Sequence, residues 1–195
     1  MATRLIEELK RVLRHLFVDK PRVPATPPAH PTVANTISKV KLSSYLRPDH
    51  IRLGLAGMDR NTALRTVAEL LRDDPCVTDF EEFFRGILKR EQMMSTGIGL
   101  GVAVPYAMSD AVTGIVLAVG CFPEGIDFQS LDSQPVTLVF LSGIPTTPRT
   151  VEANRLHLGF LGGLAKLLYR DSVRTALLRC VTPESFIDVI RQSED

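Results

Sequence analysis

The residues best suited to chemistry lie in one segment, residues 90–106, which reads REQMMSTGIGLGVAVPY. Gly97, Gly99 and Gly101 alternate within it. Because glycine adopts backbone conformations that are closed to other residues, successive amide groups there can point into one concavity, and such concavities bind anions. The spacing predicts an anion-binding turn; the alternative is a glycine-rich turn that only redirects the chain.

Three side chains beside these glycines fit the same chemistry. Ser95 and Thr96 carry hydroxyl donors, and Arg90 carries a planar guanidinium whose donors match phosphate oxygens. Together with the glycine amides they predict a phosphoryl pocket. The pattern matches neither of two common nucleotide-binding motifs, because it lacks the G-x-G-x-x-G spacing and no Gly-Lys-Ser/Thr follows it.

The elements that must position this segment are helices and strands in alternation, which predicts an α/β fold with a small central sheet. Asp59 is the expected N-cap of a helix that runs to about Arg72. Thr78, at capping-box spacing from Glu81, is the expected start of a helix that runs to about Glu91. The other predicted elements are a short helix at VKLSSYL, strands at IRLGL, VAVP, GIVLAVGCF and VTLVFLSG, and helices over residues 152–169, 171–179 and 183–191, the last with Thr182 as N-cap.

The first 38 residues differ from the rest of the chain. Residues 3–18 combine apolar side chains at helical spacing with a basic opposite face, and the next stretch is rich in proline, which can neither continue a helix nor join a sheet. We predict an amphipathic helix over residues 1–19, a Pro-rich linker over 20–38 and one compact domain over 39–195. The helix either anchors the chain to a membrane surface or a partner, or packs on its own domain or on a copy of itself.

Composition excludes several classes of protein. The 195 residues carry a net charge of +1, which is not the electrostatic footprint of a general nucleic-acid binder, so no nucleic-acid partner is expected. No apolar run reaches about 18 residues, so no transmembrane helix is predicted. Cys76, Cys121 and Cys180 are too few and too scattered for a disulfide framework or a zinc site. We expect no metal or cofactor, and a cytoplasmic location, with peripheral contact to the inner membrane if the N-terminal helix anchors there.

The glycine-rich segment resembles the signature of enzyme IIA of the phosphoenolpyruvate-dependent sugar phosphotransferase system, in its fructose/mannitol and nitrogen-regulatory type. That family carries Arg-Glu, a short spacer and then S-T-G-I-G-x-G-I/V-A-I/V-P-H, which residues 90–91 and 95–105 match without gaps. Further similarity at residues 46–71 and 123–128, in LHLGFLGGLAKLL and at residues 183–184 extends the resemblance over about residues 40–191. It implies a small mixed sheet flanked by helices on both sides and the pocket of a histidine phosphocarrier.

In this resemblance the family's phosphoryl-accepting histidine falls at position 106, where the chain has Tyr106. An imidazole has a nucleophilic nitrogen at pH 7, whereas a phenol with a pKa of about 10 is protonated there. We therefore expect Tyr106 to fill the pocket mouth, either as simple packing or with its hydroxyl bonded to Arg90 or to the glycine-turn amides. His157 matches the family's second pocket histidine.

The resemblance implies a IIA-like protein that is not phosphorylated at the usual position and regulates by binding. The implied partners are the histidine-containing carrier protein, a transporter component, or a regulated kinase or channel. Two alternatives stay open: an active phosphocarrier that accepts the phosphoryl group on His157, and an anion- or nucleotide-sensing module that uses the glycine-rich turn. Whether the chain is an enzyme is left open as well.

Overall fold

A computed structural model of the chain describes residues 40–148 and 151–194, and for residues 151–155 and 157 it describes the backbone alone. The predicted N-terminal helix, and all of the predicted linker, lie outside the described residues. Among the described helices, none has the length and apolar character that crossing a membrane requires.

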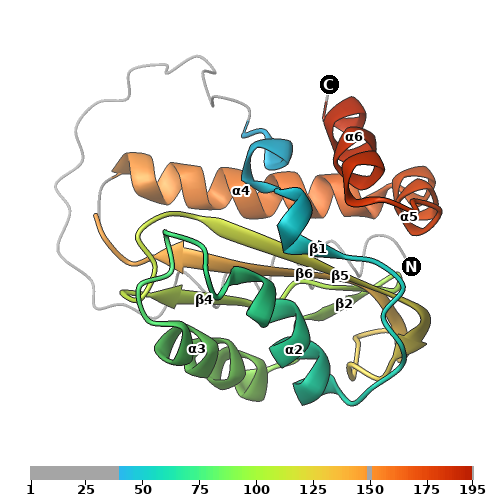
Figure 1. The fold of residues 1–195 in the computed structure, drawn as a ribbon, viewed down its shortest axis with the longest axis horizontal. Helices are drawn as coiled ribbons and strands as arrows, with labels where there is room; N and C mark the ends of the chain where they lie inside the picture. Colours follow the sequence, from blue (N-terminus) through green and yellow to red (C-terminus); the bar gives the residue numbers. More distant parts are fainter. Residues whose placement is uncertain (1–39, 149–150, 195) are drawn as a thin grey trace, which may run out of the picture. The chain divides into compact units, whose positions relative to one another are not determined.

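A six-stranded mixed sheet lies at the centre of the domain (Figure 1). The two long strands β5 and β6 pair in antiparallel fashion, β3 and β4 both pair with β6 in parallel, and the strand order is β1-β5-β6-β3-β2. The strands are β1 (Ile51–Arg52), β2 (Gly97–Gly99), β3 (Val102–Ala103), β4 (Tyr106–Ser109), β5 (Val116–Ile126) and β6 (Val136–Pro145).

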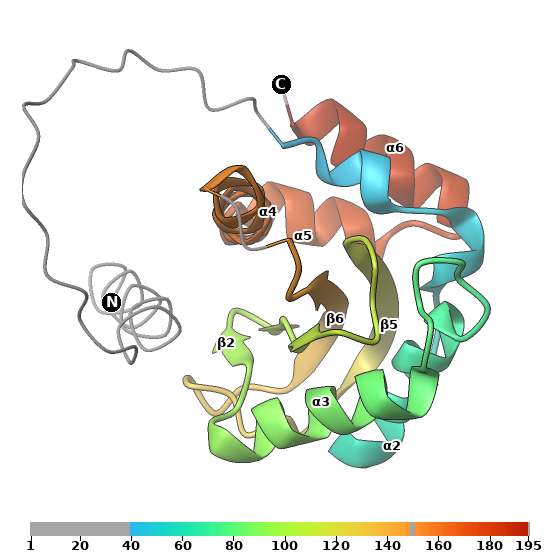
Figure 2. The same cartoon turned by 90° about the vertical axis from the view of Figure 1, so that its left-hand side faces the viewer.

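Helices cover both faces of this sheet (Figures 1 and 2). One face carries α2 (Arg60–Ala68) and α3 (Phe80–Met93), and the other carries α4 (Val151–Tyr169), α5 (Asp171–Leu178) and α6 (Pro183–Ser193). Three 3₁₀ turns complete the described elements: η1 (Leu42–Tyr45), η2 (Pro48–His50) and η3 (Glu69–Leu71). The predicted fold class, α/β with a small mixed sheet flanked by helices on both sides, is confirmed.

The sheet separates two hydrophobic cores. Val139 and Leu141 of β6 face the core beneath α2 and α3, whereas Leu138 and Phe140 face the core beneath α4, α5 and α6. Successive side chains of a strand point to opposite faces, and a strand covered on both faces is apolar throughout. This explains why residues 138–141 of β6 read as one continuous apolar run.

The helix starts agree with the sequence in part. Asp59 caps α2 as predicted, accepting from two amide groups of the first turn. The predicted start of α3 is wrong by one residue, because the carboxylate of Asp79 accepts from the N–H of Glu82 at 3.0 Å and caps the helix instead of Thr78. Thr78 donates its backbone N–H and its hydroxyl to the carbonyl oxygen of Ala111. Thr78 therefore makes a tertiary contact and is not the N-cap of α3.

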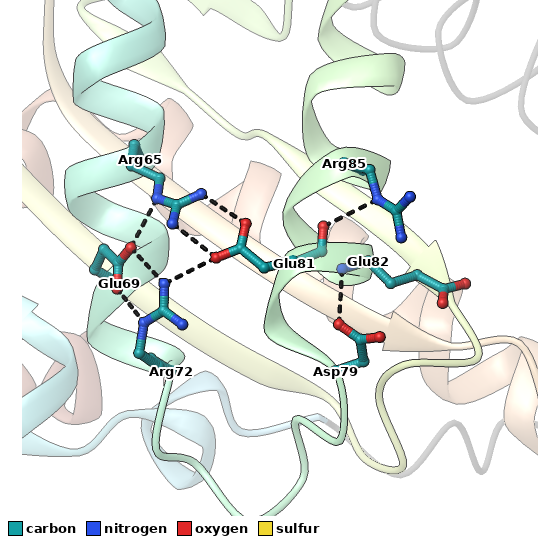
Figure 3. A network of polar contacts seen from close by, with 7 residues as sticks. All are labelled: Arg65, Glu69, Arg72, Asp79, Glu81, Glu82 and Arg85. Carbon is teal, nitrogen blue, oxygen red and sulfur yellow. Dashed lines mark hydrogen bonds and ion pairs between the residues drawn. The ribbon is translucent and has the colours of Figure 1, made fainter.

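A polar network joins α2 to α3 on the outer surface (Figure 3). The carboxylate of Glu81 on α3 accepts from Arg65 at 2.8 Å and from Arg72 at 3.0 Å, and Glu69 pairs with the same two arginines. Hydrogen bonds from Arg65 and then Arg72 lower the pKa of Glu81 to about 2. The guanidinium of Arg72 also lies 3.9 Å from the ring centroid of Phe80. The network ties α3, whose last turn carries Arg90, to α2.

Candidate functional site

The last turn of α3 and the first residue of β4 bring Arg90 and Tyr106 together. Because β4 pairs in parallel with β6, Tyr106 lies opposite Ser142 at this position of the sheet. The Nε of Arg90 donates to the hydroxyl oxygen of Tyr106 at 2.9 Å, and the guanidinium carbon lies 5.0 Å from the centroid of the tyrosine ring. The hydrogen bond between these two side chains, one of the arrangements expected from the sequence, is present.

Arg90 has a second role at the end of its helix. Its Nη1 donates to the carbonyl oxygen of Met94, the C-cap residue of α3, at 2.8 Å. A cation at a helix C-terminus interacts favourably with the carbonyl groups that lack helical partners there. The guanidinium is therefore held in one orientation by two bonds, one to the helix end and one to the phenol.

Tyr106 is only 6% exposed. Burial raises the pKa of its hydroxyl, and the hydrogen bond from Arg90 opposes that shift to a smaller extent. The phenol is therefore protonated at neutral pH, since even an exposed tyrosine titrates near about 10. Such a hydroxyl donates and accepts hydrogen bonds but is a poor nucleophile.

Thr96 lies inside the protein instead of at the mouth of the turn. Its N–H donates to the carboxylate of Glu91 at 3.0 Å, and its hydroxyl donates to the same carboxylate at 2.5 Å. Glu91 is buried, and the Nη1 of Arg60 on α2 lies 3.7 Å from it. The sequence analysis missed Glu91 as an anchor, although its place on the buried side of an amphipathic helix was a usable signal.

The glycines let the turn approach the loop that follows β5. At Gly97 an added Cβ would lie 2.6 Å from the hydroxyl oxygen of Ser130, and at Gly99 it would lie 2.9 Å from the carboxylate of Asp132. That carboxylate accepts from the N–H of Leu100 at 2.8 Å, so this amide of the turn binds an anion of the chain itself. The close approach requires residues without side chains at both glycines.

The remaining predicted site residues have different outcomes. Ser95 donates its hydroxyl to the carbonyl oxygen of Phe128 at 2.7 Å and accepts from the N–H of Gly97, so it also joins turn and loop. Gly101 has φ +73°, which glycine adopts without steric cost. The backbone of His157 lies within α4, and its side chain is outside the described residues, so its pairing with Tyr106 stays a prediction.

What the described residues offer chemically is a cation beside a neutral hydroxyl at the edge of the sheet. This pair can donate hydrogen bonds to an oxyanion, and it contains no activated nucleophile. Among the side chains that the structure describes, no group of three or more His, Cys, Asp or Glu is placed to hold a metal ion.

Comparison with known proteins gives one family and several relatives. The family described as "Phosphoenolpyruvate-dependent sugar phosphotransferase system, EIIA 2" matches residues 44–193. The chain is 32% identical over 155 residues to a fructose-specific EIIABC component of Bacillus subtilis, covering 80% of this chain but 24% of that protein. It is 29% identical over 161 residues to a fructose-specific EIIA component of Haloferax volcanii, covering 83% and 96%. It is 27% identical over 151 residues to a nitrogen regulatory protein of Pseudomonas aeruginosa, covering 77% and 95%.

Solved structures share the fold. The nitrogen regulatory protein IIA-Ntr of Neisseria meningitidis superposes with a TM-score of 0.67 at 23% identity, covering 76% of this chain and 98% of that one. The mannitol enzyme IIA of Escherichia coli, in its complex with phosphorylated enzyme IIB, superposes with a TM-score of 0.64 at 21% identity, covering 75% and 97%. Both carry the same arrangement of sheet and helices.

Proposed function

This chain belongs to the EIIA type 2 family of the phosphoenolpyruvate-dependent sugar phosphotransferase system, and from that membership we propose that it is a IIA-like protein that is not phosphorylated at the usual position and regulates partner proteins by binding them. The observation that carries the proposal is Tyr106, which ends an otherwise matched signature and which we align with the family's phosphoryl-accepting histidine.

The chemistry of the phenol supports a silent relay. A phosphocarrier needs a nucleophile that is unprotonated at neutral pH and a product that gives up its phosphoryl group again. The pKa of Tyr106 is raised by burial, so its hydroxyl stays protonated. A phosphate on a phenolic oxygen would be an ester, without the labile P–N bond of phosphohistidine.

The partners we propose are proteins of the phosphotransferase system or proteins that it regulates: the histidine-containing carrier protein, a transporter component, or a regulated kinase or channel. Relatives described as fructose-specific components and as nitrogen regulatory proteins fit both kinds of role. With such partners, the location we propose is the cytoplasm. There are two competing functions. One is a phosphocarrier that accepts the phosphoryl group on His157, and the other is a sensor of free anions or nucleotides.

The direct test is phosphoryl transfer from the phosphorylated carrier protein with labelled phosphate. We expect no acid-labile label on the wild-type chain or on Tyr106→Phe. Stoichiometric acid-labile label on the wild-type chain would contradict the proposal, and its loss in His157→Ala would assign the acceptor to His157.

We expect Tyr106→His to gain acid-labile label, because the imidazole supplies the missing nucleophile beside an intact Arg90. The measurement is label per mole of protein, with circular dichroism to show that the variant is folded. A folded variant that takes no label would show that the rest of the site no longer supports transfer.

A further inference from the structure

A groove of about 400 Å³ runs between α2 and α3, two helices that lie side by side (Figure 3). The helices are antiparallel. The Nη1 of Arg60, at the start of α2, lies 3.7 Å from the carboxylate of Glu91 near the end of α3. The Nη2 of Arg72, beyond α2, lies 3.0 Å from the carboxylate of Glu81 near the start of α3. The residues that line the groove are Asn61, Thr62, Arg65, Thr66, Glu69, Phe84 and Leu88.

The shape of this groove suits a macromolecular partner. Its volume is within the range of ~300–1,000 Å³ that is typical of ligand sites. Small-molecule sites, however, enclose most of the surface of their ligand. All residues that line this groove come from α2, the adjoining turn η3 and α3, so it is a trough along two helices. An elongated element that lies along both helices fits such a trough better than a small molecule does.

The lining of the groove combines an apolar strip with neutral polar groups, and its walls are held in place. Phe84 and Leu88 lie one turn apart on α3, so their side chains are neighbours along the helix. On the α2 side, the hydroxyl of Thr66 has only the sulfur of Met58, at 3.7 Å, as a hydrogen-bond partner among the described residues. The guanidinium carbon of Arg65 lies 4.8 Å from the ring centroid of Phe84, which connects the two walls. A preformed groove reduces the ordering cost of binding.

Two cations border the groove on its α3 side. Arg85 and Lys89 are exposed, lie one turn apart, and each follows one of the two apolar lining residues by one position. Arg85 donates its Nε to the carbonyl oxygen of Glu81 at 3.4 Å, and in the described part of the chain neither cation lies within 4.0 Å of a carboxylate. On the opposite wall Arg65 and Glu69 pair with each other. The α3 side of the groove is therefore positive and complements carboxylates that are spaced one helical turn apart.

We propose that the groove between α2 and α3 binds an acidic amphipathic helix of a partner protein. An apolar side chain of that helix packs on Phe84 and Leu88, and carboxylates one turn apart pair with Arg85 and Lys89. Arg90 follows Leu88 by two residues, about 200° further around the helix, so it lies on a different side of α3 from the groove. The inference therefore goes beyond the proposed function and does not depend on it.

The test titrates the full chain, isotopically labelled for NMR, with a synthetic helical peptide of about 18 residues, long enough to form a helix. The peptide carries leucines along one face and glutamates beside them, and a matched peptide carries lysine in place of every glutamate. We expect the acidic peptide to shift the amide signals of α2 and α3, Thr66 and Leu88 among them, and to bind at least about tenfold more tightly than the lysine peptide. Equal binding of the two peptides, no binding of the acidic peptide, or shifts confined to other elements would overturn the inference.

Two double variants with the same change of charge locate the binding surface. Arg85→Ala with Lys89→Ala removes both cations of the groove and should weaken binding of the acidic peptide at least about threefold, as two exposed ion pairs allow. Lys166→Ala with Arg179→Ala removes two exposed cations from the opposite face of the sheet and should leave binding unchanged. Equal weakening by both double variants would show attraction to the net charge alone and would overturn the groove as the site. No phosphoryl group enters the experiment, so its failure leaves the proposed function standing.

Discussion

Two adjacent residues of the signature point in different directions from α3. Arg90 reaches outward to Tyr106, while Glu91 reaches inward to the N–H and hydroxyl of Thr96. With 3.6 residues per turn, successive side chains are separated by about 100° around a helix, so the two neighbours of the pair reach different partners. The Arg-Glu pair thus connects Tyr106 to the Thr96 anchor of the glycine turn.

Removing the buried carboxylate of Glu91 should destabilise the protein far more than removing the exposed side chain of Gln92. In Glu91→Ala, the buried N–H and hydroxyl of Thr96 lose their acceptor and Arg60 loses its counterion. We expect the free energy of unfolding in urea to fall by about 1–3 kcal/mol, the cost of leaving buried donors without an acceptor. Gln92→Ala, at an exposed position of the same turn, should change it by less than about 0.5 kcal/mol. Equal effects of the two variants would rule out the anchoring role.

At the scale of the elements, sequence patterns predict the features that depend only on residues close together in the chain. The apolar runs of β5 and β6 and the periodicity of the helices are visible in the sequence, as is the cap at Thr182. The strand β4 is not predicted, because its four residues show no alternation and its pairing with β6 joins distant segments. The choice between Thr78 and Asp79 likewise depends on the distant carbonyl of Ala111. The contact of the glycine turn with the loop after β5 is equally non-local.

The contact between the glycine turn and the loop after β5 predicts that Gly97→Ala destabilises the protein. Gly162→Ala, outside this contact, should have the opposite effect. In Gly97→Ala the new methyl would lie 2.6 Å from the Ser130 hydroxyl and 2.9 Å from its Cα, so backbone must shift. We expect a loss of about 1–3 kcal/mol in the free energy of unfolding. Gly162 lies in α4 with nothing within 4 Å of an added Cβ, so Gly162→Ala should stabilise the protein by about 0.5–1 kcal/mol. The same sign for both would contradict the packing described for Gly97.

For the whole molecule, a buried histidine links stability to pH. His50, at the end of η2, is 4% exposed, its Nδ1 has no hydrogen-bond partner among the described residues, and its Nε2 lies 3.6 Å from the carboxylate of Asp74. Burial is the main cause that lowers the pKa of His50, and Arg47 lowers it further. Asp49 and Asp74 raise it, but by less. The folded protein therefore holds a neutral imidazole in its interior.

The sign of the pH dependence follows from this lowered pKa. The unfolded chain takes up the proton near about pH 6.5, before the folded protein does, so stability is complete above that value and falls as the pH decreases through it. We expect the free energy of unfolding to fall between pH 7.5 and 5.5 by at most about 1.4 kcal/mol per pH unit from this group, the limit for one proton.

His50→Asn removes the titrating group and should flatten this decrease, whereas His15→Asn, in the predicted N-terminal helix, should leave it intact. The described carboxylates whose pKa values are lowered act only below about pH 4.5 and do not enter this range; they are Asp49, Asp59, Glu69 and Glu81. Urea titrations at five pH values measure the slopes, and a His50→Asn slope equal to that of the wild type would show that the buried imidazole does not control acid stability.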